Sequence, residues 1–521
     1  MQFADIVSAR RRAGFPDPTP QVLVALQELD DVSFASHHGT QEILFTGTAV
    51  ADATFFVQQR GGHVVLAVEH RGTEVSAEVA DQLLADLDTA LTALVRRPDS
   101  QVGAVAFDSQ QNSRLVGPTP PAAPHVVADI TRFMAERPDA VAVRCCERSL
   151  TWGELDHAST VLAQQLVAAA VRPRDRIVVA LPRSVDAIVA IVATLRAGSA
   201  YVPLDPTYPA ARNRAIAHAS GARALIGTSD VGGSTTTDIT PELDELLSTE
   251  PDAAVTLPAP DLDGPAYTIY TSGSTGEPRG VTVSHRELAL STAARHVVYP
   301  TRPERFLVIS SLSFDSSVAG LFWTLTAGGT VVLPTDSEVH DVDALIDLFT
   351  TADISHTLLV PSLYRGLLAR AEPKAAWPDQ VIVAGEACGP DVVAVHVHTR
   401  PASKLSNEYG PTEATVWATV CHLDGATPGV PIGHPIPGAW TAIVDHRGEL
   451  CPAGVIGELL IGGETVTGGY DGLESDRFAG SSALGTGRTF LTGDRAACAD
   501  GRLYFHGRVD DQLNAGGLRI E

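Results

Sequence analysis

Residues Tyr270 to Gly280 read YTSGSTGEPRG, and the run that leads into them, YTIY, is β-prone. Gly273, Gly276 and Gly280 permit positive φ angles and close approach of another molecule to the backbone. Successive backbone N–H groups in such a loop form a nest for an anion. The stretch predicts a phosphate-binding loop after a strand, although composition alone favours a Gly/Ser-rich surface turn. It is not a Walker A loop, because no GK[ST] follows at the required spacing.

The composition indicates a globular protein with more than one domain. The 521 residues suggest about three units. Hydrophobic residues make up 44% of the chain and charged residues 19%. The 62 acidic side chains outnumber the 37 Lys and Arg, for a net charge of −25. Such a field repels nucleic acid and anionic membranes, so neither is expected as a partner, while a local basic groove can still hold a nucleotide.

Cysteine spacing and hydropathy narrow the class further. None of the six cysteines forms a CxxC pair, so a zinc site is not expected. We expect the cysteines to be free thiols. The start, MQFADIVSARRR, has no apolar segment of the kind that secretion signals carry. The longest apolar stretches, such as Ile188 to Leu195, are too short to cross a bilayer. We therefore expect a cytoplasmic protein.

Patterning divides the chain into an α+β start and an α/β remainder. Residues 1–108 combine short strand runs at 21–26, 42–47 and 63–70 with a helical repeat of leucines between Leu83 and Val95. The Pro-rich segment 109–125 predicts a linker. Beyond it, short strand runs such as Ile177 to Leu181, Ala224 to Ile226 and Val381 to Val383 alternate with helical patterns. This alternation predicts α/β layers around a largely parallel sheet. After about residue 430, short strands between glycines and prolines predict a small β-rich subdomain.

Six further motifs follow in order along the chain: LTWGEL at 150–155, LRAGSAYVPLD at 195–205, NEYGPTE at 407–413, GELLIGG at 457–463, LTGDR at 491–495 and GRVDDQLNAGGLRIE at 507–521. Each is weak alone. Together with the loop at 270–280, their order and spacing resemble the adenylate-forming superfamily. The wording of LRAGSAYVPLD is similar to that of its nonribosomal peptide synthetase branch, the adenylation domains.

The resemblance also implies a domain organisation. Residues 126–509 resemble the large N-terminal core of an adenylation domain, and residues 510–521 its hinge and the start of the C-terminal subdomain. Residues 1–108 resemble, more loosely, the C-terminal lobe of a condensation domain. The HHxxxDG motif of that family is absent, because His37 and His38 are followed by GTQEI. We assign no condensation activity to this part.

An ATP site is implied residue by residue. The loop would form the phosphate nest, with Thr271 and Arg279 taking part in catalysis; Arg279 stands where the family usually has Lys. Tyr409 would stack on adenine, Asp494 would accept from the ribose hydroxyls, and Arg508 would reach ribose or phosphate. Glu413 would act in catalysis and bind Mg²⁺ as a hard oxygen ligand. The implied nucleotide-binding residues are Thr271, Ser272, Gly273, Ser274, Thr275, Gly276, Gly385, Glu386, Asn407, Tyr409, Gly410, Thr412, Asp494 and Arg508.

An amino-acid pocket is implied as well. Asp315, in the segment FDSS, matches the family's carboxylate that pairs with the α-ammonium group of the substrate. Such a pairing is physically reasonable, because a buried carboxylate needs a partner for its charge. Glu408 would either accept a hydrogen bond from a donor on the substrate side chain or point into water. We expect a medium-to-large side chain that bears a donor. The implied lining is Asp315, Ser316, Ala319, Leu358, Ile382, Ala384, Glu408, Val416 and Trp417.

The resemblance implies ATP and Mg²⁺ as cofactors and an α-amino acid as substrate. The product would be an aminoacyl adenylate, passed to the phosphopantetheine thiol of a carrier protein. An MbtH-like helper protein is a further implied partner. The family's C-terminal Lys lies beyond Glu521, so we expect this chain to bind substrates and to adenylate slowly. Two alternatives stay open: an acyl- or aryl-CoA ligase, which Asp315 opposes, and a non-catalytic nucleotide-binding or docking module.

Overall fold

The computed structural model divides the chain into two compact units, residues 1–113 with 450–455, and residues 114–449 with 456–521. The structure describes residues 22–28, 32–34, 37–39, 51–60, 63–72, 75, 77–99, 113–227, 237–240, 242–259, 261–272, 278–427, 429–478, 484–485, 487–510, 513–515 and 518–520. None of the helices found in these ranges is both long and apolar enough to cross a membrane.

The first unit contains a three-stranded sheet of order β1-β4-β5 and a long helix, α2. β1 pairs in parallel with β4, which pairs antiparallel with β5. The strand runs expected at 21–26 and 63–70 and the leucine-rich helix are confirmed, whereas the run expected at 42–47 lies outside the described residues. That this unit is a condensation-domain lobe stays a prediction. The elements are β1 Val22–Glu28, β2 Val32–Phe34, β3 His37–Gly39, β4 Ala53–Arg60, β5 His63–His70 and α2 Ala77–Arg96.

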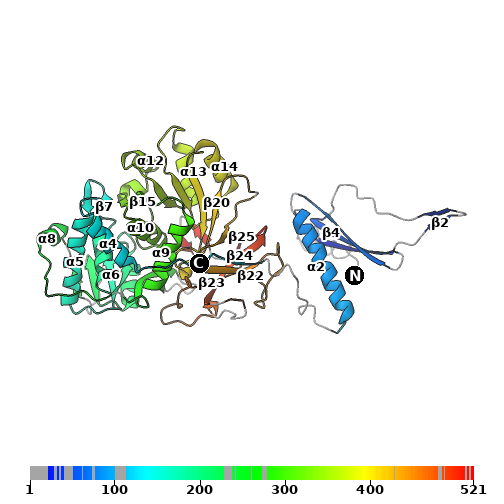
Figure 1. Cartoon of the computed structure of the whole chain (residues 1–521), viewed down its shortest axis with the longest axis horizontal. Helices are drawn as coiled ribbons and strands as arrows, with labels where there is room; N and C mark the ends of the chain where they lie inside the picture. The colour runs from blue at the N-terminus through cyan, green and yellow to red at the C-terminus, as the bar shows by residue number, and fades with distance from the viewer. Residues whose placement is uncertain are drawn as a thin grey trace. The chain divides into compact units, whose positions relative to one another are not determined.

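The second unit contains two large, mainly parallel sheets with helices packed on them (Figure 1). The six-stranded sheet has the order β12-β11-β9-β10-β13-β14 and the nine-stranded sheet the order β21-β20-β19-β18-β17-β15-β16-β7-β8. The former contains β9 Arg176–Ala180, β10 Ala200–Pro203, β11 Ala224–Gly227, β12 Thr237–Ile239, β13 Pro265–Ser272 and β14 Pro278–Ser284. The latter contains β7 Val141–Cys145, β8 Arg148–Thr151, β15 Arg305–Val308, β16 Thr330–Leu333, β17 His356–Leu359, β18 Gln380–Val383, β19 Lys404–Tyr409, β20 Thr419–Leu423 and β21 His434–Pro435.

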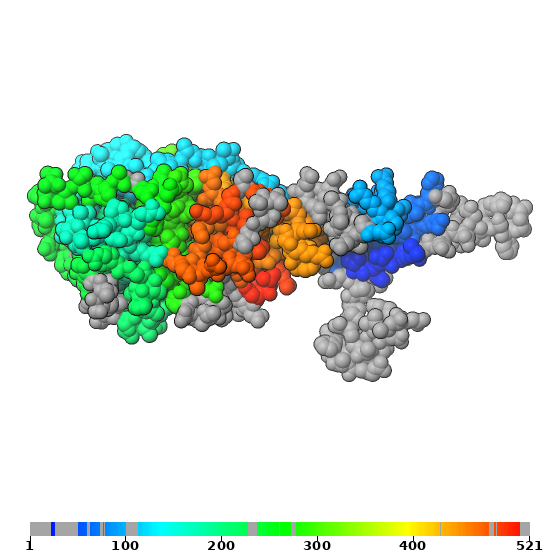
Figure 2. Space-filling model, turned by 90° about the horizontal axis from the view of Figure 1, so that it is seen from below, coloured from blue at the N-terminus to red at the C-terminus, as the bar shows by residue number. Residues whose placement is uncertain are grey.

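A third, antiparallel sheet of order β25-β24-β23-β22-β6 forms the small β-rich part that the sequence predicts. In the space-filling view the orange part of the chain, which includes β22, β23 and β24, lies beside the green part (Figure 2). Arg488 of β24 binds Glu287, which lies in the chain segment after β14, at 2.6 Å. The segment expected to be a linker supplies the edge strand β6, so part of it belongs to this sheet. The strands are β6 Arg114–Val116, β22 Ala439–Val444, β23 Gly457–Gly463, β24 Arg488–Ala499 and β25 Arg502–Arg508, followed by the pair β26 Leu513–Ala515 and β27 Leu518–Ile520.

Several of the helices, such as α5, α6 and α9, begin at a residue whose side chain caps them. At the start of α9, the Ser284 side chain accepts from the Glu287 N–H and the Glu287 side chain accepts from the Ser284 N–H, which satisfies two otherwise unpaired backbone donors. The helices are α4 Val126–Glu136, α5 Trp152–Ala168, α6 Val185–Arg196, α7 Ala210–Ser220, α8 Leu243–Ser248, α9 His285–Val298, α10 Asp315–Ala327, α11 Asp336–Val339, α12 Val342–Thr351, α13 Pro361–Arg370 and α14 Pro390–Thr399, with 3₁₀ turns η3 Thr412–Ala414 and η4 Asp476–Phe478.

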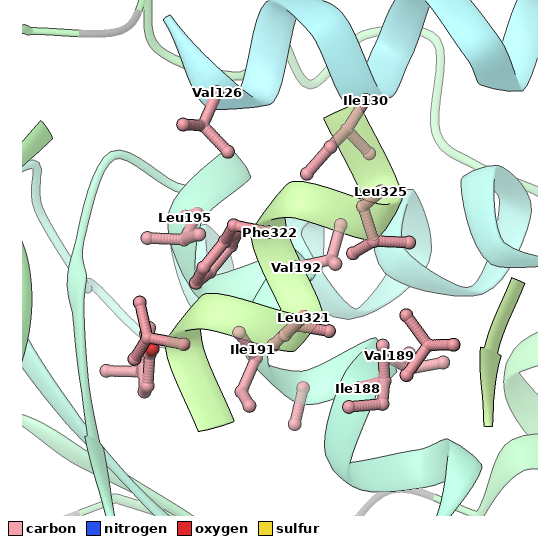
Figure 3. Packing of buried hydrophobic residues seen from close by; sticks show 14 of the residues in the cluster. Val126, Ile130, Ile188, Val189, Ile191, Val192, Leu195, Leu321, Phe322 and Leu325 are labelled. Atoms are coloured by element: carbon pink, nitrogen blue, oxygen red, sulfur yellow. The ribbon is translucent and has the colours of Figure 1, made fainter. Parts of the chain in front are cut away.

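The nine-stranded sheet is covered on both faces. One face packs with α12, α13 and α14, which lie together on one side of it (Figure 1). The other face joins a larger hydrophobic cluster that includes residues of α4, α6, α9 and α10. Figure 3 shows its centre, where Phe322 of α10 lies between Leu195 of α6 and Ile130 of α4. This cluster fixes α10, whose first residue is Asp315.

Truncating Phe322 to Ala should destabilise the second unit by about 3–5 kcal/mol, because it leaves a cavity where a fully buried ring had packed. The measurement is the denaturant midpoint of this unit's unfolding transition. Val297→Ala on α9 is the control, since Val297 is 57% exposed. Equal effects of the two substitutions would contradict the assignment of Phe322 to the core.

Candidate active site

The expected phosphate loop joins β13 to β14. Thr271 lies opposite Arg279 in this antiparallel pair, and the Thr271 hydroxyl donates to the Arg279 carbonyl at 3.5 Å. The Arg279 guanidinium lies 5.7 Å from the centroid of the Tyr470 ring. Gly273, Ser274, Thr275 and Gly276 lie outside the described residues, as does the Ser272 side chain. Of the expected loop, the structure therefore shows the two flanking residues assigned to catalysis.

In the same hairpin, Gly280 is closely approached by the Asp471 side chain. A Cβ at this position would lie 2.7 Å from a carboxylate oxygen of Asp471, which real Cβ contacts do not show. The Asp471 N–H donates to the Gly280 carbonyl at 2.9 Å, and its carboxylate binds Arg176 at 2.7 Å. The base of the loop is thus fastened to the segment that carries Tyr470.

Glu413 lies in η3 and is fully buried. The Tyr470 hydroxyl donates to Glu413 Oε1 at 2.5 Å, and the Thr467 N–H donates to the Glu413 carbonyl at 2.9 Å. Within the described ranges no group of three or more His, Cys, Asp or Glu residues could hold a metal. One carboxylate still fits Mg²⁺, which is usually bound through one or two carboxylates together with substrate phosphates. Glu413 is the residue that would hold it.

Asp315 lies close to both Thr412 and Glu413, about a hundred residues further along the chain. Burial raises the pKa of the Asp315 carboxyl to about 6, and the nearby Glu413 carboxylate acts in the same direction. A hydrogen bond from Thr412 and backbone N–H groups partly oppose the rise. In the part of the chain that the structure describes, no cationic side chain is paired with the Asp315 carboxylate, which suits a site for an ammonium group.

The loop before Asp315 is held by two residues to which the sequence analysis gave no role. Arg183 NH1 donates to the carbonyls of Val308, Ile309 and Ser310 at 3.2, 2.7 and 2.8 Å. Asp205, the last residue of LRAGSAYVPLD, accepts from the Ser311 hydroxyl at 2.7 Å. The motif that contains Asp205 was a sequence signal from which the role of this residue could have been predicted. Arg183 carried no such signal, because its partners are backbone carbonyls and Asp336, all far from it in the sequence.

A chain of hydrogen bonds connects Tyr409, Asp494 and Arg508. The Tyr409 hydroxyl donates to Asp494 Oδ2 at 2.5 Å, and Arg508 NH1 binds Asp494 Oδ1 at 2.5 Å. Burial and the Asp494 carboxylate raise the pKa of the Tyr409 phenol, so it stays a donor. Arg508 also binds Asp510, at the expected hinge, at 2.6 Å. The structure thus brings together all three residues expected at adenine and ribose.

The turn after Glu413 is strained. Thr415 and Val416 have φ angles of 56° and 79°, which are unfavourable for β-branched residues. The Ser291 hydroxyl donates to the Thr415 carbonyl at 2.8 Å, and the Trp417 indole donates to the Ser291 carbonyl at 3.2 Å. Gly410 allows this turn to approach β19, since a Cβ there would lie 2.4 Å from Trp417 Cα. Strain of this kind is typical of functional sites.

The apolar residues expected in the amino-acid pocket share one face of the nine-stranded sheet. Leu358 of β17 is aligned with Ile382 of β18, which is aligned with Ser406 of β19. Because side chains alternate along a strand, Ala384 and Glu408 continue this face toward the carboxyl ends of the strands. The same hydrophobic cluster includes Ala319, Leu358, Ile382 and Trp417, with Ala384 and Val416 packed against it. The Ser316 hydroxyl binds Ser310 at 2.9 Å.

Three expected site residues are engaged elsewhere in the protein. The Asn407 amide donates to the Pro431 carbonyl at 2.9 Å. Glu386, which follows Gly385 at a φ of 82°, accepts from the Ser362 N–H near the start of α13. Glu408 neither points into water nor awaits a substrate donor, because Arg295 and Tyr299 already supply donors to its carboxylate. Its expected role as the acceptor for a substrate donor is therefore corrected.

Comparison with known proteins agrees with this arrangement. Residues 130–471 match the family described as AMP-binding enzyme. The dimodular nonribosomal peptide synthase of Bacillus subtilis is 32% identical over 403 residues, covering 74% of this chain and 17% of that protein. Tyrocidine synthase 3 of Brevibacillus parabrevis is 30% identical over 492 residues, covering 90% of this chain and 8% of that protein. The chain thus spans a small part of these relatives.

Solved structures show the same fold. The AMPPNP-bound form of the nonribosomal peptide synthetase FmoA3 has a TM-score of 0.82 at 25% identity, covering 98% of this chain and 57% of that one. NpsA-ThdA, an artificially fused adenylation–PCP di-domain from Klebsiella oxytoca, has a TM-score of 0.70 at 25% identity, covering 77% and 82%. The chain belongs to the AMP-binding enzyme family, and the relatives and structures that it resembles are nonribosomal peptide synthetases and their adenylation domains.

Asp315→Asn should stabilise the ligand-free protein at about pH 7.5, where the native carboxylate is ionised, by about 1–3 kcal/mol. The folded-state pKa of about 6 lies above the ordinary value of 3.8, so the wild type loses stability as the pH rises through that window. At about pH 4 the two proteins should be equally stable.

Denaturant midpoints at several pH values measure this difference. Asp379→Asn is the control, because Asp379 is exposed and its substitution should leave the pH dependence unchanged. A stability gain that is the same at both ends of the pH range would argue against a raised pKa of the Asp315 carboxyl in the folded protein.

Proposed function

We propose that this chain activates an α-amino acid with ATP to form an aminoacyl adenylate. The observation that carries the proposal is the approach of Asp315 to Thr412 and Glu413, since it brings a carboxylate suited to an ammonium group next to one suited to Mg²⁺. Tyr409, Asp494 and Arg508 support a nucleotide site through their connected hydrogen bonds.

In the proposed reaction, a carboxylate oxygen of the amino acid attacks the α-phosphorus of ATP. A carbon–oxygen–phosphorus bridge forms, the bond from the α-phosphorus to the bridging oxygen of the β-phosphate breaks, and pyrophosphate leaves with that electron pair. Mg²⁺, held by Glu413, would neutralise phosphate charge. Asp315 orients the substrate through its ammonium group, Thr271 and Arg279 flank the phosphates, and catalysis comes mainly from positioning and charge stabilisation.

The proposed acceptor of the aminoacyl group is the phosphopantetheine thiol of a carrier protein. A fused adenylation–PCP neighbour of the same fold supports this partner. An MbtH-like protein is a second proposed partner, and biosynthesis of a peptide natural product such as an antibiotic, in the cytoplasm, is the proposed context. The half-buried Asp315 carboxylate argues against an aryl-CoA ligase, whose substrate carries no ammonium group. The hydrogen bonds that connect Tyr409, Asp494 and Arg508 argue against a docking module without a nucleotide site.

The decisive experiment is calorimetric titration with non-hydrolysable aminoacyl sulfamoyl adenosines, compared with sulfamoyl adenosine and a benzoyl analogue. We expect one or a few aminoacyl analogues to bind far more tightly than the other two. Preference for the benzoyl analogue would favour an aryl substrate, and absence of all binding would favour the docking module.

Asp315→Asn should weaken the preferred aminoacyl analogue about 10- to 100-fold, because a charge-assisted hydrogen bond to the ammonium group is lost. The affinity for sulfamoyl adenosine alone should be unchanged, since that ligand carries no ammonium group. Equal weakening of both ligands, measured in the same titrations, would show that Asp315 does not contact the amino acid.

A further inference from the structure

A buried ion pair lies behind the proposed amino-acid site. Arg295 of α9 binds Glu408 of β19 through two hydrogen bonds, NH1 to Oε1 at 2.6 Å and NH2 to Oε2 at 2.9 Å. Both side chains are 2% exposed. The Tyr299 hydroxyl donates to Oε1 at 2.5 Å, and burial together with the Glu408 carboxylate raises the pKa of this phenol, so it stays a donor. Every carboxylate oxygen of Glu408 thus has a donor from the protein itself.

Aromatic rings enclose the guanidinium. The Arg295 Cζ lies 4.2 Å from the Trp417 ring centroid and 5.8 Å from that of Trp323. Tyr299 stacks on Trp417 with centroids 6.1 Å apart and lies 4.9 Å from Trp323. Cation–π contacts of this kind stabilise a desolvated Arg. Arg295, Glu408, Tyr299, Trp323 and Trp417 therefore form a packed cluster from which water is excluded. Trp417 connects this cluster to the residues that line the proposed pocket.

The position of Glu408 gives this cluster its significance. Glu408 lies at the carboxyl end of β19, on the sheet face shared by Leu358, Ile382 and Ala384. Ligands of open α/β sheets bind outside the carboxyl ends of the strands. The next residue, Tyr409, begins the hydrogen-bonded chain to Asp494. Arg295, by contrast, comes from a helix that contributes none of the residues expected at the pocket.

We propose that Arg295 is a specificity-determining residue, which neutralises Glu408 and so restricts the site to α-amino acids with an uncharged apolar or aromatic side chain. This inference rests on the proposed function. Without Arg295, the Glu408 carboxylate would be an unpaired charge beside an apolar pocket and would favour a cationic side chain. With the ion pair intact, a cationic substrate side chain would be repelled by Arg295 and an anionic one by Glu408. In both cases the charged substrate side chain would also lose its hydration on entering the pocket.

Calorimetric titration of the full chain with phenylalanyl, leucyl, lysyl and glutamyl sulfamoyl adenosines tests the inference. The wild type should bind a neutral analogue at least about tenfold more tightly than either charged one, a difference of about 1.4 kcal/mol. Arg295→Met should shift the ratio of lysyl to neutral affinity at least about tenfold toward lysyl, and Glu408→Gln should shift the glutamyl ratio likewise. The double variant should restore the neutral preference.

Arg400→Met is the matched control. Arg400 is also buried, but it is held by the carbonyls of Glu372 and Pro373 beside α13, so its loss should not change the charge preference. If Arg295→Met fails to fold, Glu408→Gln, the double variant and the wild-type panel still decide. A wild type that prefers lysyl or glutamyl analogues, or folded variants with unchanged ratios, would overturn the inference. Absence of binding by every analogue, sulfamoyl adenosine included, would instead count against the proposed function.

Discussion

The central parallel strands are buried on both faces, and this burial limits where charged side chains can lie near the candidate site. Residues of β15, β17 and β18 alternate between two hydrophobic clusters, with Leu358 and Ile382 in one and Leu359, Val381 and Val383 in the other. A carboxylate placed inside these strands would lose its hydration and would need a partner for its charge. The carboxylates near the candidate site lie at the carboxyl ends of the strands and in the loops that follow them, and they are Asp315, Glu386, Glu408 and Glu413.

Charge compensation separates these carboxylates into two kinds. Glu408 and Asp494 each bind an Arg within the protein, at 2.6 and 2.5 Å, and Asp471 binds Arg176. Asp315 is different, because burial raises the pKa of its carboxyl and only neutral donors oppose that rise. Keeping such a group ionised costs free energy unless a ligand supplies the missing cation. The ligand-free protein is in this sense destabilised at the position where the proposed ammonium group would bind.

Local sequence patterns predicted what depends on neighbouring residues. The runs around Ile177, Ala224 and Val381 form β9, β11 and β18 within a residue or two of the expected limits, because a strand buried on both faces must be a short apolar run. The motif order correctly indicated the family. The assignment of Glu408 failed for a physical reason, since Arg295 lies 113 positions away and nothing in either local sequence specifies their pairing.

Other features were equally inaccessible from local patterns. The proline-rich segment predicted a linker, yet residues 114–116 pair with β22, an edge contact that depends on a strand more than three hundred residues later. The roles of Arg183 and Asp205 depend on the backbone path of the loop before Asp315, which only the folded chain defines. Sequence reasoning therefore found the residues that motifs specify and missed those that hold them in place.

The alternation along β19 finally suggests how one strand can serve two ligand groups independently. Ser406 and Glu408 face the cluster of Arg295 and Tyr299, while Asn407 contacts Pro431 and Tyr409 contacts Asp494. Adjacent side chains of a strand point to opposite faces, so the groups that would sense the amino-acid side chain are separated by the sheet itself from those that would hold the nucleotide. Substitutions in the Arg295 cluster can then alter side-chain selection without disturbing Tyr409 and Asp494, which gives the fold a physical route to new substrates at an unchanged nucleotide site.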